Sequence, residues 1–182
     1  PTQDGERVVE LRRTGDVKAV AVAYHIPSGS DPSFAAVDVL GEILSDTPSG
    51  RLYKKLVTTK LATDVGGGAY QLHDPSLLYL QASTRKDGDL EKLQKELIAT
   101  AQSFSKEPPT EEEVQRAKQA LLKSMETVQR NSRSLALQLS EWQAMGDWRL
   151  FFLYRQRLEA VTADQVAEAA SKYLKTSNRT VG

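Results

Sequence analysis

The chemistry-bearing residues of this sequence are few, and their spacing offers little to a catalyst. The chain has only two histidines, His25 and His73, and no cysteine. Neither histidine has an acidic residue or a second histidine at helical spacing, so neither the HExxH zinc motif nor its inverted HxxEH form can be written. We therefore expect ordinary polar roles for both histidines and no metal site within this chain.

Nucleophilic and phosphate chemistry have no visible basis either. No G-x-S-x-G elbow occurs, no S-x-x-K comes with supporting partners, and the lack of cysteine removes a thiol nucleophile. The run Gly66–Gly68 lacks the Lys and Ser/Thr of a phosphate-binding loop, so it indicates a bulge or a close backbone approach. We predict no catalytic residue and no cofactor in this chain.

Acidic residues recur at helical spacing in two places. Glu111–Glu113 follow Thr110, which predicts a capping box and a favourable charge at a helix N-terminus rather than a metal site. Asp38, Glu42 and Asp46 fall four residues apart on one predicted helix. They could pair for acid–base work, but we expect them to form one solvated face.

Four large side chains lie on apolar helical stripes, and we expect core packing for them rather than a cofactor site. They are Met125, Trp142, Met145 and Trp148.

Composition predicts one globular domain over residues 1–182. The chain has 40% hydrophobic residues and equal numbers of basic and acidic residues, 24 of each. The zero net charge argues against a nucleic-acid partner or a polybasic membrane surface. No apolar stretch approaches the roughly 18 residues of a membrane span. Neither end resembles a natural terminus, so we expect a domain excised from a longer protein.

Alternation and turn residues predict five strands. Segments 7–14 and 16–27 indicate a hairpin around Gly15, and segments 61–71 and 77–84 indicate a second one around 73–75. A last strand begins at 179.

Helical periodicity and capping residues predict the remaining elements. One helix begins near Ser30–Pro32 and is interrupted at 46–49, and a short helix follows over 52–57. Later helices begin at Asp89, at Thr110 with a bend or break in 129–134, at Trp148 and at Thr162. The order β-β-α-α-β-β-α-α-α-α-β predicts an α+β fold, with a mainly antiparallel sheet packed on one face by helices.

Five segments in this order resemble the C-terminal, non-metal-binding domain of the pitrilysin/insulinase-type zinc peptidases, a family that includes the mitochondrial processing peptidase. The segments are Val20–Pro27, Asp31–Leu44, Ser49–Leu56, Pro109–Lys118 and Val161–Leu174. Together they span nearly the whole chain.

The resemblance implies a protein in which an N-terminal domain carries HxxEH and a distant Glu, while this copy of the fold lacks the metal site. The family's substrate-binding Arg and Tyr, seven residues apart, fall at Val57 and Asp64. Both are replaced, so no substrate-binding residue carries over. A partner half would have to supply the pair.

The function implied by the resemblance is that of a non-catalytic domain of a zinc metalloprotease. Such a domain closes the peptide chamber and supports assembly, while zinc lies in a sister catalytic domain or a second family subunit. The alternative is a scaffold subunit of the same fold without peptidase activity, like the core proteins of the respiratory cytochrome bc complex. A third hypothesis is an unrelated α+β ligand-binding module. A bacterial parent would be expected in the periplasm, while cytoplasm and organelle stay open.

Overall fold

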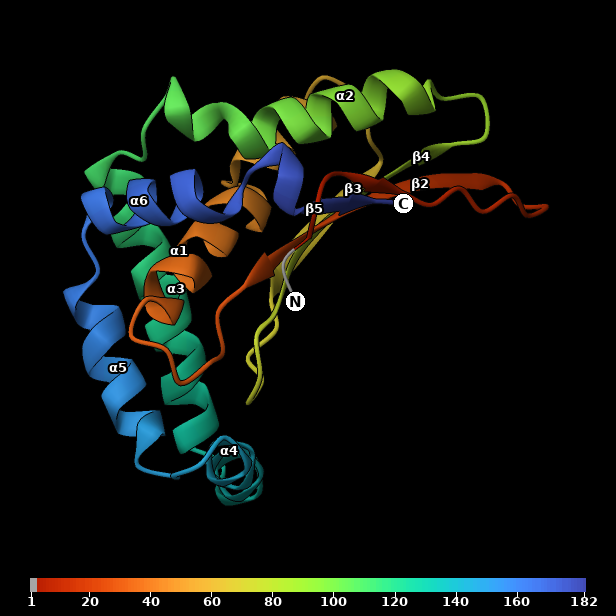
Figure 1. Ribbon diagram of the computed structural model, residues 1–182. Helices are drawn as coiled ribbons and strands as arrows, with labels where there is room; N and C mark the ends of the chain where they lie inside the picture. The colour runs from red at the N-terminus through yellow and green to blue at the C-terminus, as the bar shows by residue number, and fades with distance from the viewer. Residues whose placement is uncertain (1–2) are drawn as a thin grey trace.

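A computed structural model describes residues 3–182 and shows one five-stranded sheet with helices on one side (Figure 1). The strands are β1 (Arg7–Val8), β2 (Val17–Ile26), β3 (Asp64–Ala69), β4 (Ser76–Arg85) and β5 (Arg179–Val181). Their spatial order is β1-β5-β2-β4-β3, and every neighbouring pair is antiparallel except β1 and β5. The predicted α+β class with a mainly antiparallel sheet is confirmed.

Six α-helices complete the fold of residues 3–182. They are α1 (Phe34–Ser45), α2 (Leu90–Ala101), α3 (Glu111–Gln129), α4 (Ser132–Ala144), α5 (Leu150–Ala160) and α6 (Ala163–Tyr173). A π-helical turn covers Tyr53–Val57, where a short α-helix was predicted, and 3₁₀ turns cover Gln102–Ser105 and Thr176–Asn178.

The first predicted hairpin is wrong. β1 is only two residues long, and it pairs in parallel with β5, Arg7 opposite Thr180, instead of turning back onto β2. β5 lies beside β2 with Ala23 opposite Thr180, and the other edge of β2 is taken by β4. The C-terminal strand thus occupies the edge that a hairpin partner would need.

The second predicted hairpin is confirmed, and it explains the glycine run. β3 and β4 pair in unbroken register from Asp64 opposite Ser83 to Ala69 opposite Leu78, so there is no bulge. A Cβ on Gly67 would lie 2.6 Å from the carbonyl oxygen of Tyr79, which no side chain tolerates. The glycine run therefore allows the backbones of β3 and β4 to approach closely. This confirms the second of the two interpretations given for the run, a bulge or a close backbone approach.

Capping residues set most helix starts. Thr110 and Thr162 each form a complete capping box, with Glu113 and Gln165 respectively. Asn131 caps α4 through the amide of Ser134, at 2.9 Å, and so divides the long helical segment into α3 and α4. α1 begins at Phe34, slightly later than predicted.

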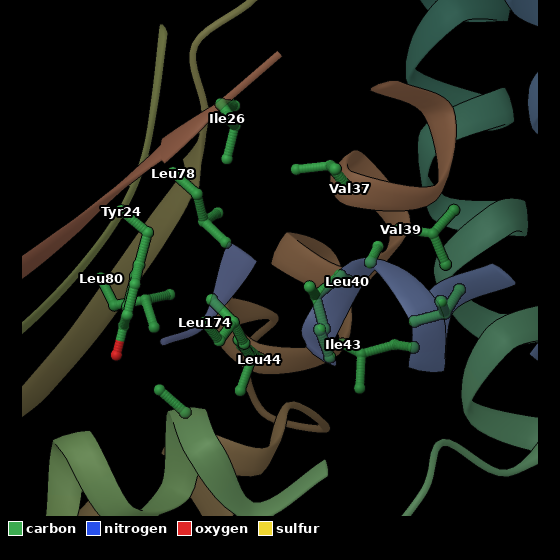
Figure 2. Close-up of a cluster of buried hydrophobic side chains, with 14 of the residues drawn as sticks. Tyr24, Ile26, Val37, Val39, Leu40, Ile43, Leu44, Leu78, Leu80 and Leu174 are labelled. Atoms are coloured by element: carbon green, nitrogen blue, oxygen red, sulfur yellow. The ribbon is translucent and has the colours of Figure 1, made fainter. Parts of the chain in front are cut away.

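The core lies between the sheet and α1. Figure 2 shows Tyr24, Ile26, Leu78 and Leu80 of the strands on one side, and residues of α1 such as Leu40 on the other. The labelled strand residues are at most 2% exposed and Leu40 is fully buried. Since α3, α5 and α6 pack on the remaining sides of α1, this helix is enclosed. All the helices of residues 3–182 lie on this side of the sheet, and its other face is free of them.

Candidate functional site

The side of the sheet away from the helices is uncovered among residues 3–182 (Figure 1). Alternation along the strands separates the two faces: Val20 and Val22 of β2 are buried, whereas Ala19 and Ala21, each directly before one of them, are exposed. β4 alternates in the same way over ten residues. The fold therefore presents a broad sheet surface that no helix of the described chain covers.

Small side chains dominate this surface. Three rows of cross-strand neighbours run across β2, β4 and β3, namely Ala19–Ser83–Asp64, Ala21–Gln81–Gly66 and Ala23–Tyr79–Gly68. We call these residues the bare sheet face. Its one charged member is Asp64, at the start of β3. Its one aromatic ring, Tyr79, stacks on exposed Tyr70 with centroids 5.1 Å apart.

The two positions aligned with the family's Arg and Tyr lie at opposite ends of the segment that leads into this face. Val57 is the last residue of the π-helical turn, and its apolar side chain is partly buried against the core. Asp64 is exposed on the bare sheet face. Val57 offers no polar atom and Asp64 only a carboxylate, so the pair has neither the cation nor the phenol that the resemblance would require.

The histidines lie in separate places and have other partners. The Nε2 atom of His25, on β2, is 3.1 Å from the side-chain oxygen of Gln3. The Nδ1 atom of His73, in an exposed turn, is 3.1 Å from Asp74. Within residues 3–182 no three His, Cys, Asp or Glu side chains are grouped so that they could hold a metal ion. The donor set therefore does not fit the zinc that the family implies.

The acidic row of α1 is not the solvated face that was predicted. Asp38 and Glu42 are only partly exposed, because α3 and α5 pack against this side of α1. The hydroxyl of Tyr154, on α5, donates a hydrogen bond to Asp38. Burial raises the pKa of Asp38 to about 6, against that hydrogen bond. Burial, with a contribution from Asp46 and Asp38, raises the pKa of Glu42 as well.

A signal for this burial was present in the sequence. The residues around Asp38, in the segment FAAVDVLGEIL, are apolar on every side of the helix. A helix that is apolar on all sides is buried in a protein, so the carboxylates on it, here Asp38 and Glu42, are partly buried by neighbouring elements as well. The partner Tyr154 could not be found this way, because it lies 116 residues further along the chain.

The acidic triplet caps its helix as predicted and also makes an ion pair. Glu113 accepts hydrogen bonds from Arg51 at 2.7 and 2.9 Å, with both side chains less than one-fifth exposed. Chiefly through this hydrogen bonding, Arg51 lowers the pKa of Glu113. The Arg51 guanidinium also lies 4.2 Å from the ring centre of Phe104. The pair ties the turn before β3 to the start of α3, which is a structural role.

The core prediction holds for Trp142 and Met145, which are 2% and 8% exposed, and Met125 is partly buried and packs against the hydrophobic core. It is wrong for Trp148, which is 45% exposed and contacts Phe152 edge to face at the beginning of α5. Trp148 lies before the first residue of α5, so the helical spacing of apolar residues does not apply to it. Its side chain packs on the solvent-exposed side of α5.

Comparison with known families identifies the family to which this domain belongs. Residues 1–121 match the model of the peptidase M16 inactive domain. The chain therefore belongs to this family, as the resembling segments indicated, and it is an inactive C-terminal domain of the kind found in zinc protease-like proteins.

Particular relatives support this assignment. The inactive peptidase domain of a candidate zinc protease from Bordetella parapertussis is 42% identical, with a TM-score of 0.88 over 96% of this chain and 95% of that one. The zinc protease PqqE of Helicobacter pylori is 24% identical over 99% of this chain. The chain spans 41% of that relative's length.

A more distant likeness concerns the fold alone. A chain in the structure of Complex III2 from Candida albicans has a TM-score of 0.82 at 13% identity, over all of this chain and 45% of that one.

None of the helices within residues 3–182 has both the length and the apolarity needed to cross a membrane.

Proposed function

We propose that this domain forms one wall of a peptide chamber and closes it against a sister catalytic domain or a second family subunit. Zinc and its activated water belong to that partner, and the peptide lies between the two. The observation that carries the proposal is the bare sheet face, a wide surface that no helix within residues 3–182 covers and whose three rows consist mostly of small side chains, with Gln81 and Tyr79 as the larger ones.

Small side chains suit a surface that borders an extended peptide. The alanine, glycine and serine positions keep most of this surface flat, so peptides of different sequence can lie against it with few side-chain clashes. A surface of this kind binds weakly by itself, because it offers few charges and no deep pocket for an anchor residue. Its contribution is to exclude water from the partner's site and to limit the size of the substrate.

The residues of this chain favour a protein in which a partner domain or subunit carries out catalysis and this domain does not. Within residues 3–182 neither His25 nor His73 belongs to a group of three possible metal ligands, and the aligned positions Val57 and Asp64 hold no Arg or Tyr. The partner would therefore supply the metal, the activated water and the groups that hold the substrate.

A bulky substitution on the bare sheet face tests the proposal. In the assembled peptidase, Ala21→Trp should lower kcat/KM for unfolded peptides at least about tenfold, because the indole fills space that the peptide backbone needs. The matched control is Ala136→Trp, at an exposed position of α4 on the helical side, which should change kcat/KM less than about twofold. Unfolding curves of both variants establish that each folds.

Two results would count against a chamber wall. Equal turnover by the Ala21→Trp variant and the native assembly would show that peptide does not approach this face. Equal losses in Ala21→Trp and Ala136→Trp would show a general effect on folding or assembly rather than an effect on the peptide.

The second candidate is a scaffold subunit, and the fold shared with a chain of Complex III2 favours it. A scaffold would use the same surface to hold a partner permanently. A zinc-loaded assembly that leaves every member of a peptide library intact would support this candidate over the first.

A further inference from the structure

A second feature lies on the helical side of the molecule, away from the bare sheet face. It is a cavity of about 160 Å³ between α1, α3, α4 and α5. Its lining includes residues with polar groups, Asp38, Gln71, Trp142 and Tyr154, and the apolar residues Leu121, Met125 and Phe151. An engineered protein cavity of about 150 Å³ accepts a benzene ring, so this one has room for a molecule the size of one amino acid.

Two hydrogen-bond donors in this lining have no partner among the described residues. They are the indole Nε1 of Trp142 and the amide Nε2 of Gln71, and both atoms are fully buried. Trp142 as a whole is 2% exposed. A buried donor without an acceptor costs about 1–3 kcal/mol, so these two groups favour a ligand that brings an acceptor.

Packing keeps Gln71 in place. Its side chain lies against Gly29, where an added Cβ would come within 2.4 Å of the Gln71 Cγ and 3.0 Å of the Met145 sulfur. The amide of Gly29 also donates to the carbonyl of Leu72 at 2.8 Å. The glycine therefore makes room for the glutamine stem beside the cavity.

The same cavity has a carboxylate without a cation. Asp38 accepts a hydrogen bond from Tyr154, and the lining includes no Lys, Arg or His. Trp142 and Tyr154 have ring centroids 5.4 Å apart, and Phe151 lies 6.5 Å from Trp142. A carboxylate in a cavity whose lining also holds aromatic rings favours an organic ammonium ion.

We propose that this cavity binds a small organic ammonium ion that also bears a carbonyl or carboxyl acceptor, the chemistry of a free amino acid or of the first residue of a peptide. The ammonium group pairs with Asp38 beside the aromatic rings of the lining, and the acceptor receives hydrogen bonds from Trp142 and Gln71. The inference stands independently of the chamber, since it concerns the opposite side of the sheet.

The test titrates the 182-residue chain with L-leucinamide and follows the indole N–H resonances by NMR. The chain has only two tryptophans, so exposed Trp148 is an internal reference for Trp142. We expect a saturable shift of the Trp142 resonance and none at Trp148. N-acetyl-leucinamide, which lacks the ammonium, should bind at least about tenfold more weakly, as befits the loss of a charge-assisted hydrogen bond. 3-Methylbutylamine, which lacks the acceptor, should bind about three- to tenfold more weakly.

Variants assign the site. Asp38→Asn keeps an acceptor for Tyr154 and should weaken leucinamide binding at least about tenfold, whereas the neighbouring Glu42→Gln should change it less than about threefold. The tripeptide Leu-Gly-Gly distinguishes the two sources: binding equal to that of leucinamide indicates a peptide N-terminus, and much weaker binding indicates a free amino acid.

Three outcomes would overturn the proposal. They are the absence of a saturable Trp142 shift up to the solubility limit of leucinamide, an equal response to N-acetyl-leucinamide, and undiminished binding by the Asp38→Asn variant. Each would leave a cavity that holds water or apolar groups only.

Discussion

Helices α1 and α4 have nearly the same length, 12 and 13 residues, but lie in opposite surroundings. α1 has nine buried residues and lies between the sheet and three other helices. α4 has one buried residue, Trp142, and forms the outer end of the helical layer (Figure 1). The central helix has no side-chain N-cap bond, whereas the peripheral helix is capped by Asn131.

The difference shows two ways to hold a helix. Enclosure on all sides stabilises α1 through apolar burial, so α1 needs no cap and can even retain a covered carboxylate. α4 buries too little to rely on packing, so its local end signal matters more. The proposed ligand cavity is lined by residues of both helices, Asp38 of the enclosed α1 and Trp142 of the peripheral α4.

The largest expected effect comes from shortening a core side chain of α1. Leu40 is fully buried, whereas Leu137 of α4 is 59% exposed. Leu40→Ala should lower the free energy of unfolding by about 2–5 kcal/mol, through lost burial and a new cavity. Leu137→Ala should change it by less than about 0.5 kcal/mol. Urea unfolding of both variants measures the contrast, and similar losses would contradict the enclosed position of α1.

An intermediate effect is expected from the covered carboxylate. Folding raises the pKa of Asp38 from its ordinary 3.8 to about 6, so the folded state holds this proton more tightly than the unfolded state does. The stability it contributes is full below pH 4 and is lost as the pH rises through 6. With allowance for partial exposure, the loss amounts to about 2 kcal/mol.

Asp38→Asn removes this titration. The difference in free energy of unfolding between the variant and the native chain should therefore grow in favour of the variant between about pH 4 and pH 7, as measured by urea unfolding at several pH values. Taking the difference cancels the contribution of Glu113, whose pKa is lowered and whose stabilisation is instead lost as the pH falls. A pH-independent difference would show that solvent reaches Asp38 freely.

The smallest expected effect concerns the peripheral helix. Asn131→Ala removes the acceptor for the Ser134 amide and should cost about 1 kcal/mol. Because α4 buries little, the loss should appear mainly as faster hydrogen exchange in its first turn, with little change in the core strands. Uniformly faster exchange throughout the protein would mean that α4 unfolds only together with α1.

Local signals predicted much of this fold from sequence. The capping boxes at Thr110 and Thr162 and the β3–β4 hairpin follow from residues within a few positions of each other. The pairing of β1 with β5 does not, because Arg7 and Thr180 lie at opposite ends of the chain and no local pattern joins them.

The two candidate sites differ in the same way. The alternation that defines the bare sheet face is visible in β4, but the rows across it depend on the pairing of β2 with β4, strands about 50 residues apart in the chain. For the cavity, the apolar run around Asp38 indicates a covered helix, while the contacts with Gln71, Trp142 and Tyr154 come from three distant segments. Spacing alone could not place Trp148 outside the core and Trp142 inside it.

The proposed role as a chamber wall is tested most directly by reconstitution. Hydrolysis of an unfolded peptide is measured for the zinc-bearing sister domain or subunit alone, for this chain alone, and for the two mixed at increasing ratios. We predict that this chain alone is inactive and that the partner's rate rises until the two are equimolar. A partner that is indifferent to this chain, or turnover by this chain in isolation, would contradict the account.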